Sequence, residues 1–248
     1  MDSSSWHWRD GILTCDLLSQ WQHGFFTRSH NPQMPQDLHR SFYSEGVAYR
    51  AKQVHGDRLI HAQDISTEPP LPEADGVWVS PEFANAPTSV WVCTADCVPI
   101  LIGDRRLGAV AAVHAGWRGT AAKIVKETVI QLCQRGSELK DLLVALGPAI
   151  TGEAYQVSQS VAEQVVATIQ TPVGVTPDRE PDRCRLDLRL VQQQQLKELG
   201  IAPEQVAIAP YCTLQTPEHF FSYRRYCLEH GVEAKRSPQV QWSGIAIR

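Results

Sequence analysis

The stretch VPILIGDRRLGAVAAVHAGWRGT, residues 98–120, decides the fold of this chain. It holds two apolar runs, 98–102 and 107–115, separated by a polar turn that contains a Gly-Asp pair. β-Branched and small apolar side chains in short runs bounded by turn residues predict buried strands. A threonine after the second run can cap a helix over 120–135. The stretch therefore predicts two strands followed by a helix.

Comparable patterns elsewhere predict the rest of the secondary structure. We expect strands at 77–80, 89–93, 142–146, 205–209 and 240–247, and helices at 158–170 and 186–199. Ser158 suits a helix N-cap and Gly200 a helix end, and QQQQ at 192–195 is expected to form an exposed helix face. Pro-rich polar segments at 29–40 and 64–73 are expected to be surface loops. The elements mix without a regular βαβ alternation, which favours the α+β class.

Composition limits the classes of partner. The 248 residues are 43% hydrophobic and 20% charged, which is ordinary for a soluble globular protein. A net charge of −4 argues against nucleic acid as the main partner. No apolar run approaches the ~18 residues needed to span a membrane, and the N-terminus lacks the features of a secretory signal. We expect a cytoplasmic protein that is a monomer or homodimer.

Absent motifs exclude several enzyme classes. The sequence has no GxGxxG, GxxxxGK[ST], GxSxG or HExxH, which are signatures of dinucleotide-binding, P-loop, α/β-hydrolase and metalloprotease sites. It also lacks CxxC, so a thioredoxin-type site or a zinc ribbon is not expected. The absence of a His-x-His pair argues against an ordinary multicopper oxidase site.

Three short segments combine metal-coordinating residues with glycine or tight-turn chemistry. They are QVHG (53–56), TADC (94–97) and VHAGWRG (113–119). Two histidines and one cysteine, His55, Cys97 and His114, could form a tetrahedral zinc site with one open position, the pattern of catalytic zinc. Their separations match no short metal-binding motif. Core packing, or a Cys97 nucleophile activated by His114 with Asp75 or Asp96 as orienting acid, remains open from spacing alone.

Seven segments occurring in one order carry a family resemblance. They are QVHG, ADGVWVS, TADCVPILI, AAVHAGWRGT, LGPAI, CT and FFSYRR. Together they closely resemble the YfiH/DUF152 family, once labelled multicopper polyphenol oxidases or laccases. Its members are now described as zinc-dependent purine nucleoside phosphorylases with adenosine deaminase and methylthioadenosine phosphorylase activities, and some are called peptidoglycan editing factor. The resemblance, from about residue 24 onward, implies a single domain over 1–248 with an N-terminal extension at 1–20. It also implies a layered α/β/β/α sandwich with mixed sheets.

The resemblance also implies a site and an activity. The family's zinc ligands fall on His55, Cys97 and His114, with Cu²⁺ as the alternative metal. The expected reaction is cleavage of adenosine, inosine and methylthioadenosine by phosphate, giving free base and (methylthio)ribose 1-phosphate, together with deamination of adenosine. The alternatives are a copper-dependent polyphenol oxidase, a cysteine hydrolase or amidase acting on peptidoglycan precursors, and a metal-binding protein without enzymatic activity.

Phosphorolysis requires residues that bind phosphate near the ribose. Arginine suits this task because its planar guanidinium offers two parallel donors to an oxyanion. The candidates are Arg118 in GWRG, Arg28 in FFTR, and Arg224 and Arg225 in SYRR, with Gln53 of QVHG as a further substrate-binding candidate. A surface or structural ion pair is the alternative role for each of the four arginines.

Deamination requires a carboxylate that moves a proton. Asp75 and Asp96 are the candidates, although Asp75 could simply form an Asp-Gly turn, and Asp96 could point away from Cys97 because adjacent strand residues alternate. Tyr155, Phe220 and Tyr223 could stack on a purine or pack in the core. The sequence departs from the family pattern at loops 29–40 and 226–241, which could border the pocket and leave the substrate preference open.

Overall fold

The computed structural model describes residues 5–66, 68–84, 86–231 and 239–247. Most strands belong to two mixed sheets of six strands each. Sheet 1 contains, in spatial order, β1 (Trp6–Arg9), β2 (Ile12–Cys15), β3 (Gln22–Phe26), β15 (Gln241–Ile247), β7 (Thr88–Thr94) and β4 (Val47–Arg50). Sheet 2 contains β14 (Val206–Ile208), β10 (Leu142–Leu146), β8 (Val98–Asp104), β9 (Val110–Ala115), β6 (Gly76–Val79) and β5 (Leu59–His61).

A smaller sheet and six α-helices complete the described part of the chain. The small sheet contains β11 (Gln156–Ser158), β13 (Arg183–Leu186) and β12 (Val175–Pro177). The helices are α1 (Pro35–His39), α2 (Trp117–Ala121), α3 (Ile124–Gln134), α4 (Gln159–Val166), α5 (Leu188–Leu199) and α6 (Tyr223–His230). No helix among the described residues combines the length and apolar character needed to cross a membrane.

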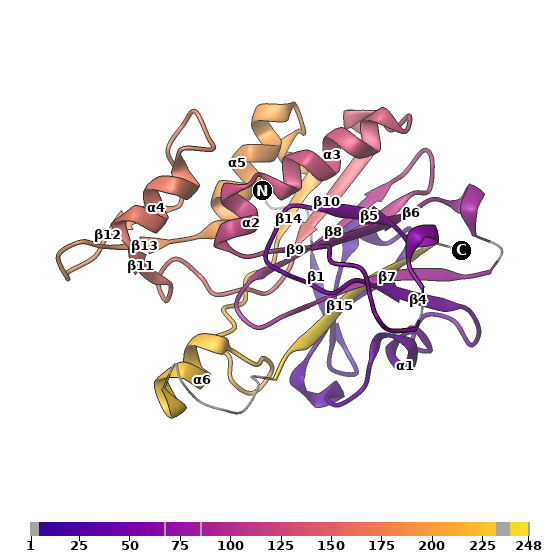
Figure 1. The fold of residues 1–248 in the computed structure, drawn as a ribbon, viewed down its shortest axis with the longest axis horizontal. Coiled ribbons are helices and arrows are strands. Elements are labelled where there is room, and N and C mark those ends of the chain that lie inside the picture. The colour runs from indigo at the N-terminus through magenta and orange to yellow at the C-terminus, as the bar shows by residue number, and fades with distance from the viewer. Residues whose placement is uncertain (1–4, 67, 85, 232–238, 248) are drawn as a thin grey trace.

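The two large sheets pack against each other, and helices cover their outer faces. Side chains of β8 alternate: Leu101 belongs to the core between the sheets, whereas Ile100 and Ile102 pack in the core under α3 and α5. On the other side, Leu38 of α1 packs with Trp91 of sheet 1. Figure 1 shows α3 and α5 along one side of the molecule and α1 on the opposite side. The expected α+β fold with α/β/β/α layers and mixed sheets is confirmed.

The register of sheet 2 determines what meets at each of its ends. β8 and β9 form an antiparallel pair in which Val98 lies opposite Ala115, and β6 pairs with β9 so that Gly76 lies opposite Val113. The turn before β8, the end of β9 and the residue before β6 therefore lie at the same end of the sheet. The segments QVHG, TADC and VHAG converge at that end.

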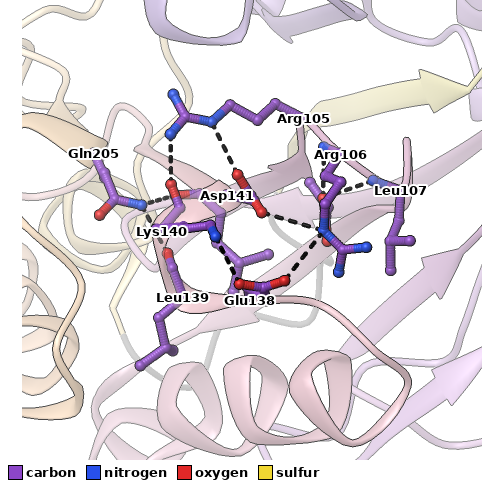
Figure 2. A network of polar contacts seen from close by, with 10 residues as sticks. Arg105, Arg106, Leu107, Glu138, Leu139, Lys140, Asp141 and Gln205 are labelled. Atoms are coloured by element: carbon purple, nitrogen blue, oxygen red, sulfur yellow. Dashed lines mark hydrogen bonds and ion pairs between the residues drawn. The ribbon is translucent and has the colours of Figure 1, made fainter.

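The opposite end of sheet 2 is held by a polar network around the β8–β9 turn (Figure 2). Asp141 accepts hydrogen bonds from Arg105 Nε at 3.3 Å and from Arg106 Nε at 3.2 Å, and Arg106 also lies 3.7 Å from Glu138. Both arginine side chains are partly exposed, so each pair contributes at most about 1 kcal/mol. The network joins the turn to the segment before β10 and lies remote from the predicted metal ligands.

The helix expected over 120–135 is interrupted. Thr120 lies inside α2, where its hydroxyl donates a 2.9 Å hydrogen bond to the Gly116 carbonyl, so it is not the N-cap. Lys123 has a left-handed backbone with φ of 63°, and α3 begins only at the next residue. The prediction of one continuous helix was wrong. The predicted cap at Ser158 and the helix end at Gly200 are both confirmed.

The glutamine run on α5 is not an exposed face. Gln192 and Gln195 are fully buried, and only the middle two glutamines are partly exposed. Gln192 Nε2 donates to Thr120 Oγ1 at 2.8 Å. Gln195 Nε2 donates to the Thr120 carbonyl at 3.0 Å and to Thr168 Oγ1 at 2.7 Å. Thr120 of α2 and Thr168, which follows α4, accept hydrogen bonds from the side-chain nitrogens of these buried amides, which the local pattern could not show.

Substituting one of these buried amides tests the network. Gln195→Ala is expected to lower the free energy of unfolding by about 2–3 kcal/mol, because it leaves a cavity and removes a donor from two buried oxygens. Gln193→Ala in the same run is the matched control, with an expected change of at most about 0.5 kcal/mol. Urea unfolding of both variants measures the difference. Equal effects would contradict the role assigned to Gln195.

Two segments expected to be loops contain regular structure, and so does the expected N-terminal extension. The predicted loop at 29–40 includes α1, which begins with Pro35 in its first turn. The predicted loop at 226–241 begins inside α6, while its residues 232–238 lie outside the described residues. The segment expected to be an N-terminal extension supplies β1 and β2, which pair with each other, and β2 then joins β3 at the edge of sheet 1.

Candidate metal centre

Three side chains from distant parts of the sequence meet at the convergent end of sheet 2. His55 lies in the loop after β4, Cys97 in the turn between β7 and β8, and His114 in β9. Their ligand atoms all lie within 4.8 Å of one another. The two imidazole rings meet edge to face with centroids 4.7 Å apart. The pairing of Pro99 with His114 across β8 and β9 brings the turn that carries Cys97 next to this histidine.

The donor set fits a zinc-type ion. Donors bound about 2.0–2.3 Å from a tetrahedral zinc lie roughly 3.5 Å apart, so modest inward movement of the side chains would suffice. His114 is buried, Cys97 is half-buried and His55 is exposed. A metal held by these three ligands would be rigidly supported on one side and approachable from the side of His55. Three protein ligands with one open position is the arrangement of a catalytic site.

The buried carboxylate of Asp75 organises both histidines. Its Oδ1 accepts hydrogen bonds from His114 Nδ1 at 2.8 Å and from the His55 backbone N–H at 2.9 Å. Its Oδ2 accepts from the backbone N–H groups of Gly56 at 2.7 Å and Val54 at 3.2 Å. Because a carboxylate only accepts, the hydrogen of His114 is assigned to Nδ1, which leaves Nε2 to coordinate. The same bonds hold His55 in its left-handed backbone conformation, with φ of 61°.

The electrostatics of the cluster favour a thiolate. Burial opposes ionisation of Cys97, but hydrogen bonds from His114 and His55 outweigh it and lower the pKa of the thiol to about 7. Burial likewise opposes a charge on His114, yet its hydrogen bonds to Asp75 and Cys97 raise its pKa to about 9. The thiolate is the form of cysteine that binds metals and attacks electrophiles.

Asp96, the neighbour of Cys97, turns toward the opposite side. Its carboxylate accepts hydrogen bonds from Thr213 Oγ1 at 2.6 Å, Ser222 Oγ at 2.9 Å and the Arg224 backbone N–H at 2.7 Å. Its backbone has φ of 91°, which is unusual for a residue with a side chain. Both acids proposed from the sequence as proton carriers therefore accept several hydrogen bonds from the protein itself.

Three of the predicted substrate-binding residues bond to backbone groups. Gln53 pairs with the backbone of Cys93, donating to its carbonyl and accepting from its N–H, both at 2.8 Å. Arg28 and Arg225 donate to backbone carbonyls of the 213–220 segment. Each of the three side chains therefore has structural partners within the protein, and these partners are backbone groups rather than the ion pairs expected as the alternative for the arginines.

Arg118 and Arg224 keep more of their donors available. Arg118 is exposed and lies over the ring of Trp117, with its Cζ 4.3 Å from the ring centroid. Arg224 donates one 2.8 Å hydrogen bond to the Gln156 carbonyl and lies 5.4 Å over the ring of Tyr155. Burial and the nearby Cys97 raise the pKa of Tyr155 to about 12, and both arginines oppose this rise. The two arginines, the tyrosine and the cysteine thus lie within electrostatic reach of one another.

The chain matches the model of a known protein family. A family model described as multi-copper polyphenol oxidoreductase laccase matches residues 35–235. The chain belongs to this laccase family. This match confirms the family expected from the sequence. The chain also shares the fold of the Bacillus licheniformis hypothetical protein YfiH. That crystal structure matches with a TM-score of 0.79 and 23% identity, covering 98% of this chain and 99% of the other.

Relatives of this chain have names other than laccase. A Synechocystis sp. protein named purine nucleoside phosphorylase is 45% identical over 273 aligned residues, which cover 99% of this chain and 98% of that protein. A protein from an unknown prokaryotic organism, named adenosine deaminase, is 32% identical over 143 residues, or 57% of this chain and 55% of that protein. The names of these relatives concern nucleosides rather than phenols.

The name of the laccase family implies copper, and the donor set is compatible with it. Two histidines and one cysteine also form the equatorial ligands of copper electron-transfer sites. The same set with an open fourth position suits catalytic zinc. The geometry therefore indicates a metal-binding group without selecting the metal.

Two of the partners of Asp96 were not singled out from the sequence. Thr213 and Ser222 lie in the segments CT and FFSYRR. These segments contribute to the family resemblance but suggested no role for the two residues. Thr213 is fully buried and Ser222 nearly so. The sequence around a hydroxyl does not indicate that it will bond a carboxylate more than 100 residues away. Only the presence of the motifs could have pointed to Thr213 and Ser222.

A glycine beside Cys97 provides a local test of the centre. A Cβ added at Gly116 would lie 2.8 Å from Cys97 Sγ, closer than van der Waals contact allows. Gly116→Ala is therefore expected to reduce the bound metal well below one ion per chain. At Gly56 an added Cβ would meet only ordinary contacts, 3.5 Å from Asp75, so Gly56→Ala is the matched control. Elemental analysis measures both, and full occupancy in Gly116→Ala would contradict the expected crowding.

Proposed function

We propose that this chain is a zinc-dependent purine nucleoside phosphorylase that also deaminates adenosine. The observation that carries the proposal is the His55–Cys97–His114 cluster with Asp75 behind it. The near full-length similarity to a relative named purine nucleoside phosphorylase supports the reaction class. The relative named adenosine deaminase supports the second activity. Adenosine, inosine and methylthioadenosine are the proposed substrates.

Each group of the chain receives a proposed task. His55, Cys97 and His114 would hold the ion, which when bound supplies Lewis acidity and lowers the pKa of water. Asp75 orients the two histidines through the four hydrogen bonds that its carboxylate accepts.

Phosphate binding is assigned to the arginines with available donors. In phosphorolysis an oxygen of hydrogen phosphate forms a bond to C1′ of the ribose while the C1′–N9 bond breaks, and the proton lost by the phosphate balances the proton that the departing purine takes up. Arg118 and Arg224 can bind the phosphate because each retains guanidinium N–H groups for an oxyanion. Tyr155, which lies under Arg224, offers an aromatic face to the purine or ribose.

Two other functions retain specific support. The name of the family model favours a copper-dependent phenol oxidase, which would require copper for activity. The lowered pKa of Cys97 next to His114 favours a cysteine hydrolase or amidase, which would be alkylated readily and would resist chelators. The phosphorylase is preferred because similarity along nearly the whole chain supports it.

Product analysis distinguishes these functions. Purified protein loaded with zinc or copper is incubated with adenosine, inosine or methylthioadenosine, with and without phosphate, and separately with phenols. We expect free base and a sugar 1-phosphate only in the presence of phosphate, inosine from adenosine without it, and loss of both activities with chelator. Phenol oxidation confined to the copper-loaded protein, or turnover that a chelator leaves unchanged, would overturn the proposal.

A further inference from the structure

Asp96 is a buried carboxylate without a cationic partner among the described residues. Only 8% of the residue is exposed, and none of the ion pairs in the described part of the chain includes it. Burying a carboxylate is costly unless hydrogen bonds replace its hydration. Three donors at 2.6–2.9 Å provide that replacement. This set of three hydrogen bonds indicates that Asp96 holds the residues that donate them in place.

Two of the three donors lie at the start of α6. Ser222 is its N-cap, and Arg224 offers its backbone N–H from the first turn. The third donor, Thr213, lies earlier in the chain. The Ser222 hydroxyl also accepts the Arg225 N–H at 3.2 Å. Free N–H groups and the helix dipole at an N-terminus favour a nearby negative charge. Asp96 thus joins the turn that carries Cys97 to the first turn of α6.

The first turn of α6 carries a group that matters at the metal centre. The guanidinium of Arg224 lies over Tyr155, and the charges of Arg224 and Cys97 both act on the phenol of that tyrosine. Cys97 and Asp96 are adjacent and turn to opposite sides, one toward the histidines and the other toward α6. The Asp96–Cys97 dipeptide therefore fixes the backbone of Arg224 relative to the metal ligands. The Gln156 carbonyl and the Tyr155 ring hold its guanidinium.

We propose that Asp96 is a positioning residue that holds Arg224 at the edge of the metal centre, where Arg224 binds the phosphate co-substrate. The inference rests on the proposed function for its ligand, inorganic phosphate. It replaces the role of proton carrier with a role in phosphate affinity. Asp96 acts through Arg224, so loss of either residue should weaken the same step.

Measurement of phosphate binding and turnover in a double-mutant cycle tests this. The zinc-loaded wild type, Asp96→Asn, Arg224→Gln and the double variant are compared by calorimetry with inorganic phosphate, with KM for phosphate and kcat measured in parallel. We expect each single variant to raise the Kd and KM for phosphate roughly tenfold, with little change in kcat at saturating phosphate, and the double variant to be no worse than Arg224→Gln. Asp104→Asn, a buried carboxylate at the far end of sheet 2, should leave phosphate binding unchanged.

A milder variant keeps the test open if Asp96→Asn fails to fold. Thr213→Val keeps the charge of Asp96 and removes its 2.6 Å hydrogen bond, so a smaller rise in phosphate Kd with unchanged zinc content is expected. Additive effects in the cycle, or a fall in kcat with unchanged phosphate Kd, would overturn the inference. So would wild-type protein that binds no phosphate. Phosphate binding that depends on Asp96 and Arg224 without nucleoside cleavage would instead overturn the proposed function alone.

Discussion

Cys97→Ala is expected to reduce bound zinc from about one ion per chain to nearly none. A site with three protein ligands loses its only thiolate in this variant, and two histidines alone bind zinc weakly. His55→Ala and His114→Ala should have the same effect. Phosphorolysis and deamination should both fall more than about 100-fold, because ligand loss should exceed the 10–100-fold cost of losing a supporting residue. Elemental analysis and the nucleoside assay measure the two effects on the same samples.

A neighbouring cysteine is the control for this experiment. Cys93 lies on β7, four residues before Cys97, but packs with the residues on the outer face of sheet 1. Burial raises the pKa of its thiol to about 11, and it is not part of the His55–Cys97–His114 group. Cys93→Ala should retain zinc and activity. Full zinc content and activity in Cys97→Ala would contradict the assigned centre.

Asp75→Asn is expected to weaken zinc affinity about 10–100-fold, the range seen when a residue that orients a metal-binding histidine is lost. An asparagine amide can replace only one acceptor oxygen, and its NH₂ would face N–H donors that now bond to Oδ1 or Oδ2. His114 would lose its fixed orientation, and the loop carrying His55 would lose its anchor. Competition with a chromophoric chelator measures the affinity.

The comparison with a second buried aspartate separates positioning from general destabilisation. Asp104 is also buried and accepts the backbone N–H groups of Arg106 and Leu107, each at 2.8 Å. Asp104→Asn should lower the melting temperature without changing the zinc Kd. Unchanged zinc affinity in Asp75→Asn together with a large fall in kcat would show that Asp75 carries protons instead of orienting ligands.

The strands of sheet 2 could be predicted because an uninterrupted run of apolar residues indicates a strand that is buried on both faces. Runs such as 98–102 and 142–146 are apolar throughout, and both form strands buried on the two faces. Ser158 and Gly200 were predictable as well, since caps depend on the immediate backbone. Gln192 and Gln195 were not, because the burial of an amide depends on partners supplied by other parts of the chain, here Thr120 of α2.

The sequence by itself determined which donor atoms are available and that short turns would present them at the ends of strands. Its motifs pointed to His55, Cys97 and His114, and the register of sheet 2 brings them together. Only the tertiary structure decided what the two acids contact. The partners of Asp75 and Asp96 lie tens to more than a hundred residues away. The chemical role of a carboxylate depends on the hydrogen-bond donors around it, and long-range packing positions those donors.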